Sequence, residues 1–353
     1  MKKNRQVYII TEKIGHGHKS VSDALEEILK EQFNVIIIDY FSLIGENIDR
    51  SIGSIYGYLI SNFPYLYKLV YSLIDRQDST KLMDMMIAQR LKNKIGSGIE
   101  DSILISTFPN PTIALSYIKA YRKYSIITDY FAHSGWITKK IDGYFVANKE
   151  IKDRLYKSGV EKEKIHITGI PIRQKFYKDI NIKEIKNNLG INNTKKTILI
   201  LGGGDGVIQD AKYIISLFEN KYNIIIITAK NKNLRNSLEK NANKNTKVLG
   251  YVDNIEEIMS ISDLAITKAG GLSLSELNLK RVPIIIYKTI PGQETENTKY
   301  FIKNNACIEI NDKEKLKITA NNILSGKIKV DGKIINKRYP ATLKIINIIQ
   351  KEL

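Results

Sequence analysis

Two glycine-bearing segments with attached polar side chains are the residues of this sequence best placed for chemistry. Gly15 to His18 lies near the N-terminus, and Thr267 to Glu276 lies in the second half. Each follows an apolar, strand-like run and precedes a helix-like pattern, which is how a parallel α/β domain presents backbone N–H groups to an anionic ligand. Because each turn carries a distinctive polar residue, His18 or Glu276, we predict two α/β domains that face each other across a cleft.

Apolar runs that can form strands alternate with helix-like patterns along both halves of the chain. Most of these runs are rich in isoleucine or valine and lack clean polar alternation, as expected of strands covered on both faces. Such alternation predicts βαβ units and parallel sheets. The expected strands are Val7–Thr11, Asn34–Tyr40, Ser102–Phe108, Tyr124–Asp129, Gly143–Ala147, Ile165–Thr168, Thr197–Leu201, Asn223–Thr228, Lys247–Val252, Leu264–Thr267, Pro283–Tyr287 and Cys307–Ile310.

The length of 353 residues allows roughly two domains, each with a core of its own. Gly169-Ile170-Pro171 ends the first set of strands, and a polar stretch leads into the second set. We therefore predict an α/β chain with a first domain over residues 1–171 and a second over residues 172–335. Residues 336–353 are expected to form a last helix that packs back toward the first domain.

The composition excludes several classes of protein. Cys307 is the only cysteine, so no disulfide can form within the chain, and a cytosolic location fits. No run of about 18 apolar residues is present, so we expect no membrane-spanning helix. The apolar run at Val7 to Ile10 is too short for a signal peptide.

The net charge of +18 predicts attraction to an anionic surface, either lipid headgroups or nucleic acid. A purely compositional origin is the alternative, because only ten of the 55 basic residues are arginine and lysine, isoleucine and asparagine are all abundant. No zinc-finger spacing, aromatic RNA-binding motif or arginine-rich arm is present. We therefore predict an anionic membrane surface, and no nucleic acid, as a partner.

One long helical pattern, over residues 48–94, breaks the alternation of strands and helices. Apolar residues follow helical spacing up to Pro64, which should interrupt the helix, and tyrosines, leucines and basic residues come after it. Tyrosine beside aliphatic side chains and lysine suits a membrane interface. A helical excursion that packs on its own domain is the alternative.

Taken together, these residues resemble the lipid glycosyltransferases that include bacterial processive diacylglycerol glucosyltransferases and plant monogalactosyldiacylglycerol synthases. These are relatives of the peptidoglycan UDP-GlcNAc transferase in glycosyltransferase family 28. The resemblance covers nearly the whole chain and rests on motifs in the family's order: Gly15 to His18, Thr128 to Trp136, Asp142 to Val146, Gly169 to Ile172, Gly202 to Gly206, Thr267 to Gly271, Ser275-Glu276 and Pro291 to Asn297. Ala269 is a mild departure, since the family usually has proline there.

The resemblance implies a GT-B fold, with two Rossmann-like parallel-sheet domains facing an interdomain cleft. It implies an inverting hexosyltransferase that uses a UDP-sugar donor, with glucose favoured, and needs neither a metal ion nor another cofactor. The acceptor would be diacylglycerol or its monohexosyl product. An enzyme of this kind is expected to be a peripheral protein on the cytoplasmic face of the cell membrane, where its acceptor lies.

In the first half, the resemblance assigns the catalytic base to His18. A histidine suits this task near neutral pH, although a helix cap or an acceptor contact without proton transfer is also compatible with its place. Asp129 would orient a histidine or act as the base itself, unless it is only a turn residue. Gly17, His133 and Trp136 would contact the acceptor.

In the second half, glycines that follow strands suit the diphosphate, because absent side chains let backbone N–H groups approach an oxyanion. The residues expected to bind the UDP-sugar are Gly203, Gly204, Gly270, Gly271, Ser275, Glu276, Gln293, Glu294 and Asn297. By resemblance, Glu276 accepts hydrogen bonds from the ribose hydroxyls and the last three hold the sugar. Two alternatives stay open: Ser273 to Glu276 reads as a capping box, and Pro291 to Glu294 as a turn that starts a helix.

Three other functions remain compatible with the sequence. A different lipid acceptor, such as an undecaprenyl-linked sugar, would keep the same chemistry. A UDP-GlcNAc 2-epimerase-like enzyme would share the fold and act on soluble donor alone. A non-catalytic UDP-sugar-binding protein would have no need of the base at His18.

Overall fold

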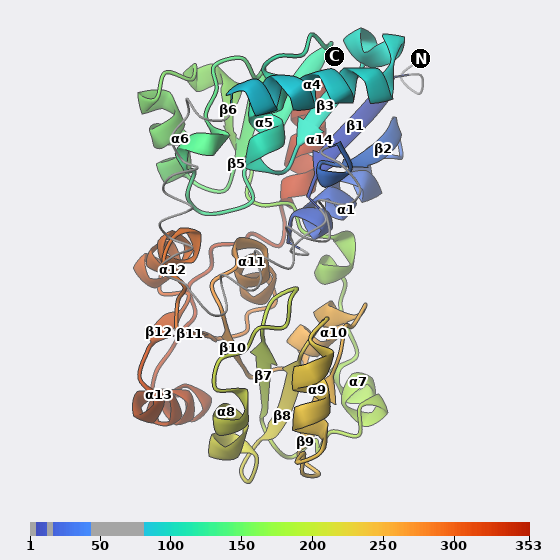
Figure 1. Cartoon of the computed structure of the whole chain (residues 1–353). Helices are drawn as coiled ribbons and strands as arrows, with labels where there is room; N and C mark the ends of the chain where they lie inside the picture. The colour runs from blue at the N-terminus through green and yellow to red at the C-terminus, as the bar shows by residue number, and fades with distance from the viewer. Residues whose placement is uncertain (1–4, 13–16, 44–80) are drawn as a thin grey trace. The chain divides into compact units, whose positions relative to one another are not determined.

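The computed structural model of this protein describes residues 5–12, 17–43 and 81–353. The chain divides into two compact units (Figure 1). Unit 1 comprises Met1–Gln174 and Arg338–Leu353, and unit 2 comprises Lys175–Lys337. Within the described ranges, no helix is both long and apolar enough to cross a membrane.

Unit 1 contains a six-stranded parallel sheet in the order β2-β1-β3-β4-β5-β6. From β1 the chain passes to β2 on one side, and β3 then pairs with the other side of β1. In open α/β sheets, ligands bind outside the carboxyl ends of strands at such a reversal. The strands are β1 (Gln6–Thr11), β2 (Asn34–Asp39), β3 (Ile103–Ser106), β4 (Arg122–Ile126), β5 (Gly143–Val146) and β6 (Ile165–Ile167).

Helices that connect the strands bury one apolar stripe each against the core of unit 1. In α1, Val21, Leu25 and Ile28 are buried at helical spacing. The helices of unit 1 are α1 (Gly17–Leu29), α4 (Lys81–Ile95), α5 (Pro109–Leu115), α6 (Lys149–Lys157) and α14 (Ala341–Lys351). Of the predicted long helical segment, residues 48–80 lie outside the described residues, and α4 covers the remainder.

The helix α14 follows unit 2 in the sequence but belongs to unit 1, where it packs beside α1 (Figure 1). Ile345 and Ile349 on α14 are completely buried. Just beyond the helix, the carboxylate of Glu352 accepts a hydrogen bond from the Tyr124 hydroxyl at 2.7 Å. Unit 1 is therefore built from two stretches of chain that are separated by the whole of unit 2.

Unit 2 repeats the plan with a parallel sheet in the order β12-β11-β10-β7-β8-β9. All five residues of β7 and all five of β8 are buried, which explains why both strands are purely apolar after their first residues, Thr197 and Asn223. The reversal of strand order lies between β7 and β10. The strands are β7 (Thr197–Leu201), β8 (Asn223–Ile227), β9 (Thr246–Leu249), β10 (Leu264–Thr267), β11 (Ile284–Tyr287) and β12 (Ile308–Ile310).

The connecting helices of unit 2 complete its doubly wound architecture. They are α7 (Ile182–Asn188), α8 (Ala211–Phe218), α9 (Lys232–Glu239), α10 (Ile255–Ser260), α11 (Gly271–Leu279), α12 (Gln293–Lys303) and α13 (Lys313–Leu324). The predicted α/β class, with two Rossmann-like parallel sheets, is confirmed.

Candidate active site

His18 lies at the strand reversal of unit 1, as the second residue of α1. Gly17, the first residue of the helix, is exposed, and a Cβ there would meet no other atom. Residues 13–16, which carry the other part of the glycine motif, lie outside the described residues. The histidine therefore stands where α/β folds place their ligands.

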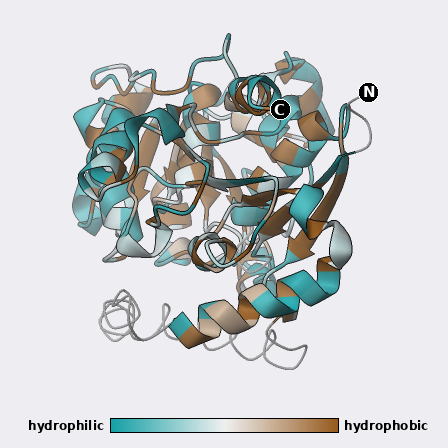
Figure 2. Ribbon diagram, turned by 90° about the horizontal axis from the view of Figure 1, so that it is seen from above, coloured by the Kyte–Doolittle hydropathy of each residue, from teal (hydrophilic) through white to brown (hydrophobic). Residues whose placement is uncertain are grey.

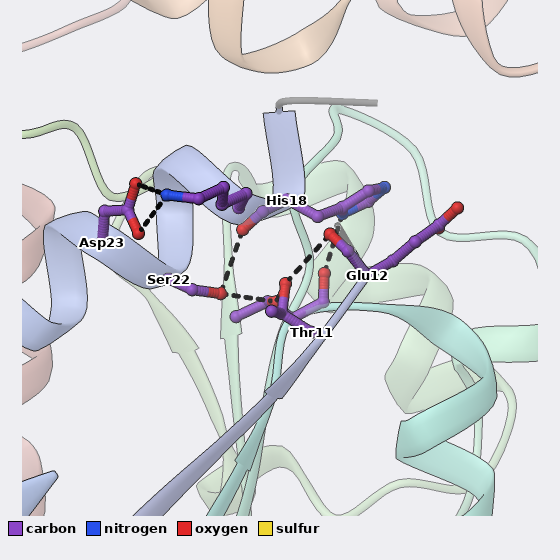
Figure 3. Close-up of polar contacts among 7 residues, drawn as sticks. Thr11, Glu12, His18, Ser22 and Asp23 are labelled. Carbon is purple, nitrogen blue, oxygen red and sulfur yellow. Dashed lines mark hydrogen bonds and ion pairs between the residues drawn. The ribbon is translucent and has the colours of Figure 1, made fainter. Parts of the chain in front are cut away.

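The hydrogen bonds of His18 fix which of its ring nitrogens carries the proton. Its Nδ1 lies 2.8 Å from the backbone carbonyl oxygen of Thr107 (Figure 3) and 3.0 Å from the Thr128 hydroxyl. A carbonyl oxygen can only accept a hydrogen bond, so Nδ1 must be the protonated nitrogen of the neutral ring. The lone pair then lies on Nε2, which is the atom available to accept a proton.

A chain of hydroxyl groups holds the start of α1 against β1 and β3 (Figure 3). The Ser22 hydroxyl donates to the backbone carbonyl of His18 at 3.0 Å and lies 3.1 Å from the Thr107 hydroxyl. The Thr107 hydroxyl in turn donates to that of Thr11 at 2.8 Å. Because Ser22, Thr107 and Thr11 are fully buried, this network limits how the helix, and with it His18, can move.

The environment of His18 keeps its ring neutral. Burial lowers the pKa of His18 from 6.5 to about 4, and the hydrogen bond to Thr107 opposes this change in part. The Phe108 ring packs edge-on against the imidazole, with ring centroids 5.0 Å apart. At neutral pH the ring is therefore unprotonated at Nε2. Because the side chain bonds to a distant strand, the helix-cap alternative for His18 is wrong.

Asp129 is buried three residues after the end of β4 and directly follows Thr128. Thr128, which sequence reasoning did not select, supplies the side-chain hydroxyl that reaches His18. The sequence could have indicated Thr128 as a site residue, because it follows β4 closely and precedes Asp129, which was predicted.

His133 shapes the turn that follows β4. It is the N-cap of the short 3-10 helix Ser134–Trp136, and its Nδ1 accepts a hydrogen bond from the Gly135 amide at 3.2 Å. A Cβ at Gly135 would lie 2.9 Å from the His133 ring, so a larger residue there would displace the imidazole from this position. The imidazole is partly buried, and its predicted contact with an acceptor stays a prediction.

Trp136 lies in a different environment from the one its predicted role suggests. Its side chain is fully buried in the apolar core of unit 1. Among the described residues, its indole Nε1 has no hydrogen-bond partner. The tryptophan therefore anchors the turn in the core, and its side chain has no surface exposed to an acceptor in this structure.

In unit 2 a tight glycine loop follows β7, at the reversal of strand order. Gly203 and Gly206 have positive φ angles of 68° and 65°. The amide of Gly206 donates to the carbonyl of Gly203 at 3.1 Å. A Cβ at Gly206 would lie 1.7 Å from the carbonyl oxygen of Thr228. Only glycine can therefore adopt the backbone conformation of this loop at positions 203 and 206 without strain. Gly204 lies between them.

The second predicted phosphate loop joins β10 to α11. Gly270 is the N-cap of α11 and Gly271 is its first residue. Since the helix begins there, Ser273 lies inside it, and the capping-box explanation of Glu276 is wrong. Glu276 is nearly buried, at 5% exposure, and Ser275 donates from its buried hydroxyl to the Gly271 carbonyl at 2.7 Å. This bond of Ser275 thus lies within its own helix.

The predicted sugar-binding residues lie in the first turns of α12, which follows Gly292 with its φ of 120°. Gln293 and Glu294 open the helix, and both are partly buried. Asn297 is 1% exposed and donates from its side-chain amide to the backbone carbonyl of Ala269 at 3.0 Å. This bond ties α12 to the loop after β10, so the two predicted donor-binding segments are held together.

Two residues of this region were missed by sequence reasoning. Lys268 follows β10 and forms an ion pair with Glu294, with 3.8 Å between Nζ and Oε1. Asp210, the N-cap of α8, binds Lys288 at 2.5 Å and Lys313 at 2.9 Å. Asp210 also accepts a hydrogen bond from the Tyr287 hydroxyl. Desolvation raises the pKa of Asp210, but these partners outweigh it and lower the value to about 2.

A small hollow of about 30 Å³ lies at this edge of the unit 2 sheet and is lined by both Lys268 and Lys288. Among the described residues, no cluster of histidine, cysteine or carboxylate side chains could hold a metal ion. A reaction independent of metal ions and cofactors stays a prediction.

Comparisons with known proteins match both units. Residues 18–172 match the family described as monogalactosyldiacylglycerol (MGDG) synthase, and residues 197–327 match the glycosyltransferase family 28 C-terminal domain. A processive diacylglycerol beta-glucosyltransferase of Bacillus cereus (strain G9842) is 34% identical over 332 residues, which cover 88% of this chain and 84% of that protein.

Two solved structures show the fold. The UDP-GlcNAc 2-epimerase from Neisseria meningitidis bound to UDP-GlcNAc has a TM-score of 0.65 at 13% identity, covering 98% of this chain and 100% of that one. MurG of Acinetobacter baumannii has a TM-score of 0.58 at 13% identity, covering 98% and 99%. Together with the two parallel sheets, these likenesses confirm the predicted GT-B fold.

Proposed function

Since the chain belongs to the family of diacylglycerol glycosyltransferases and is a UDP-sugar-dependent hexosyltransferase, we propose that it transfers glucose from UDP-glucose to diacylglycerol or to a monohexosyldiacylglycerol. The observation that carries this proposal is the hydrogen bond from His18 Nδ1 to the Thr107 carbonyl. It leaves an unprotonated Nε2 on His18 at the carboxyl edge of the unit 1 sheet, as proton transfer from an alcohol requires.

In the proposed reaction, the acceptor hydroxyl attacks the anomeric carbon of the donor. The new bond forms between the acceptor oxygen and that carbon, while the bond from the carbon to the phosphate oxygen breaks. UDP leaves with the bonding electron pair, and His18 Nε2 takes the proton of the hydroxyl. A single displacement inverts the configuration, and such a base contributes roughly 10²- to 10⁴-fold in rate.

Unit 2 is proposed to bind the donor at the reversal between β7 and β10. Backbone amides of Gly203, Gly204, Gly270 and Gly271 would contact the diphosphate, since glycines leave those amides accessible. The nearly buried carboxylate of Glu276 offers two acceptor oxygens for the vicinal hydroxyls of ribose.

We propose that the start of α12 binds the donor sugar, because its side chains can form hydrogen bonds. Gln293 and Glu294 lie in its first turn, and their side chains can hydrogen-bond to sugar hydroxyls. Asn297 holds this turn against the loop after β10 through its bond to Ala269, so it would position the sugar site as well as contribute to it. The buried Ser275 is assigned to the interior of α11.

The exposed face of α4 supports peripheral binding to a membrane. Leu82, Met83, Met85 and Met86 are 40–83% exposed, and Lys81 lies beside them. Hydrophobic and hydrophilic residues alternate along the ribbon of this helix (Figure 2). Apolar side chains beside a lysine suit a surface of anionic lipid, which supports the proposal that the protein acts at the cytoplasmic face of the membrane, where its acceptor would lie.

Incubation with liposomes that contain diacylglycerol tests the proposed function directly. Labelled UDP-glucose, UDP-galactose and UDP-GlcNAc are supplied in parallel, and the products are separated by chromatography. We expect a β-glucosyl lipid, identified by the proton coupling of its anomeric carbon, and no product from His18→Ala. A product only on an undecaprenyl-linked acceptor would refute diacylglycerol as the acceptor, and epimerised UDP-GlcNAc without lipid would refute transfer.

A further inference from the structure

Lys268 lies among the residues proposed to bind the donor, but it has no role in that proposal. It follows the last residue of β10, and β10 pairs with β7 at the strand reversal of unit 2. Its side chain extends over the glycine loop after β7, because a Cβ on Gly203 would lie 2.5 Å from Lys268 Cε. Glycine is needed at position 203 for its positive φ, and a Cβ there would also displace the stem of Lys268.

The ammonium group of Lys268 lies where three loops meet. The stem contacts the loop after β7, and the ammonium points toward Glu294 on α12, which follows β11. The backbone carbonyl of Lys268 accepts a hydrogen bond from the amide of Gly270, the N-cap of α11. The side chain is only 28% exposed, so its charge is partly shielded from solvent.

The two lysines that line the hollow differ in how their charges are compensated. Lys288 lies 2.5 Å from Asp210, which is a close charged contact. Lys268 has Glu294 as its ion-pair partner among the described residues, at 3.8 Å, which is longer than a hydrogen bond. The ammonium of Lys268 therefore retains N–H groups that can bind an added anion.

We propose that Lys268 binds the diphosphate of the UDP-sugar and neutralises the charge that develops as UDP leaves. This inference rests on the proposed function and adds a residue that the motif assignments do not include. A cation beside the breaking bond between the anomeric carbon and the phosphate oxygen stabilises the departing diphosphate more in the transition state than in the ground state. Glu294 holds the ammonium in place from the side of the sugar.

Binding measurements with UDP and uridine isolate this contact, because the two ligands differ only in the diphosphate. Isothermal titration calorimetry on the wild-type protein should show tighter binding of UDP. Lys268→Met keeps the aliphatic stem and removes the charge, and it should weaken UDP roughly 10- to 100-fold, the value of a hydrogen bond to a charged group. Its affinity for uridine should stay unchanged, and Lys268→Arg should restore much of the preference.

Lys299→Met is the matched control, since Lys299 is a 66% exposed lysine on α12 that pairs with Glu296. It should leave both affinities unchanged. Steady-state rates provide the second readout: Lys268→Met should lower kcat as well as raise KM for the donor. If Lys268→Met unfolds, Lys268→Gln, which keeps a polar side chain, is measured in its place.

The outcomes separate this inference from the proposed function. If the variant retains the wild-type preference for UDP over uridine, Lys268 does not bind the diphosphate, whatever the enzyme transfers. If the wild-type protein itself shows no preference for UDP, the UDP-sugar donor is refuted and the proposed function fails with it. Loss of UDP and uridine binding together would mean that Lys268 only supports the fold, and would also overturn the inference.

Discussion

The pH dependence of the reaction tests whether His18 acts as the base in the environment described. Burial places its pKa at about 4, and kcat/KM reports the ionisation of groups in the free enzyme. At pH 5.5, about 97% of such a histidine is neutral, whereas about 9% would be neutral with the ordinary value of 6.5. The rate should therefore stay nearly flat from pH 8 to pH 5.5, and fall only near pH 4.

Replacing Phe108 with alanine should move the acid limb of this profile. Its ring packs edge-on against His18 and shields the imidazole from water, and burial is the larger cause of the lowered pKa. Water admitted by the Phe108→Ala variant stabilises the protonated ring, so the limb should shift upward, toward pH 6.5. Phe33→Ala, which removes a buried ring elsewhere in unit 1, is the control and should leave the limb in place.

The assay measures initial rates of transfer into diacylglycerol liposomes between pH 4 and pH 9, with donor well below KM. The same shift affects stability: the unfolded chain protonates near pH 6.5 and the folded one near pH 4. The free energy of unfolding should therefore decrease as pH falls through this window. A wild-type acid limb at pH 6.5, or identical limbs in wild type and Phe108→Ala, would refute the proposed environment of the base.

Three further predictions concern other parts of the molecule. Glu276→Ala should weaken UDP binding roughly 10- to 100-fold in calorimetry, because a buried carboxylate is lost from the ribose site; unchanged affinity would remove Glu276 from that site. Gly206→Ala should lower the midpoint of urea unfolding, since the new Cβ would lie 1.7 Å from a carbonyl oxygen at a positive φ; an unaltered midpoint would contradict the loop geometry. The double substitution Leu82→Asn and Met86→Asn should reduce sedimentation with anionic vesicles while leaving UDP affinity intact; undiminished sedimentation would rule out α4 as the contact surface.

The order and type of the elements could be predicted because apolar runs without polar alternation are a local signal. The predicted strands over 197–201 and 264–267 are β7 and β10 themselves, and the others differ from the structure by one to three residues at their ends. The position of His18 at a strand end was predictable for the same reason. Its partner Thr107 was not, since that bond joins residues 89 apart in the sequence.

The incorrect predictions arose where local pattern and tertiary packing disagree. Ser273 to Glu276 has the residue types of a capping box, but α11 begins two residues earlier, at Gly271, because the helix continues directly from the β10 turn. Trp136 lies within a motif shared with lipid glycosyltransferases, yet its ring fills the core. Lys268 and Asp210 were missed because their partners are 26 to 103 positions away.

Unit 1 is built from two separate stretches of chain, so it can be completed only at the end of synthesis. Unit 2 is one continuous stretch, so it can complete its fold as soon as it emerges from the ribosome. Unit 1 lacks α14 until synthesis has passed residue 351, and the apolar face of α1 that α14 covers stays open for the intervening time. A truncated product that ends after Lys337 would keep that surface uncovered, and it would be the form of this protein most exposed to aggregation and proteolysis.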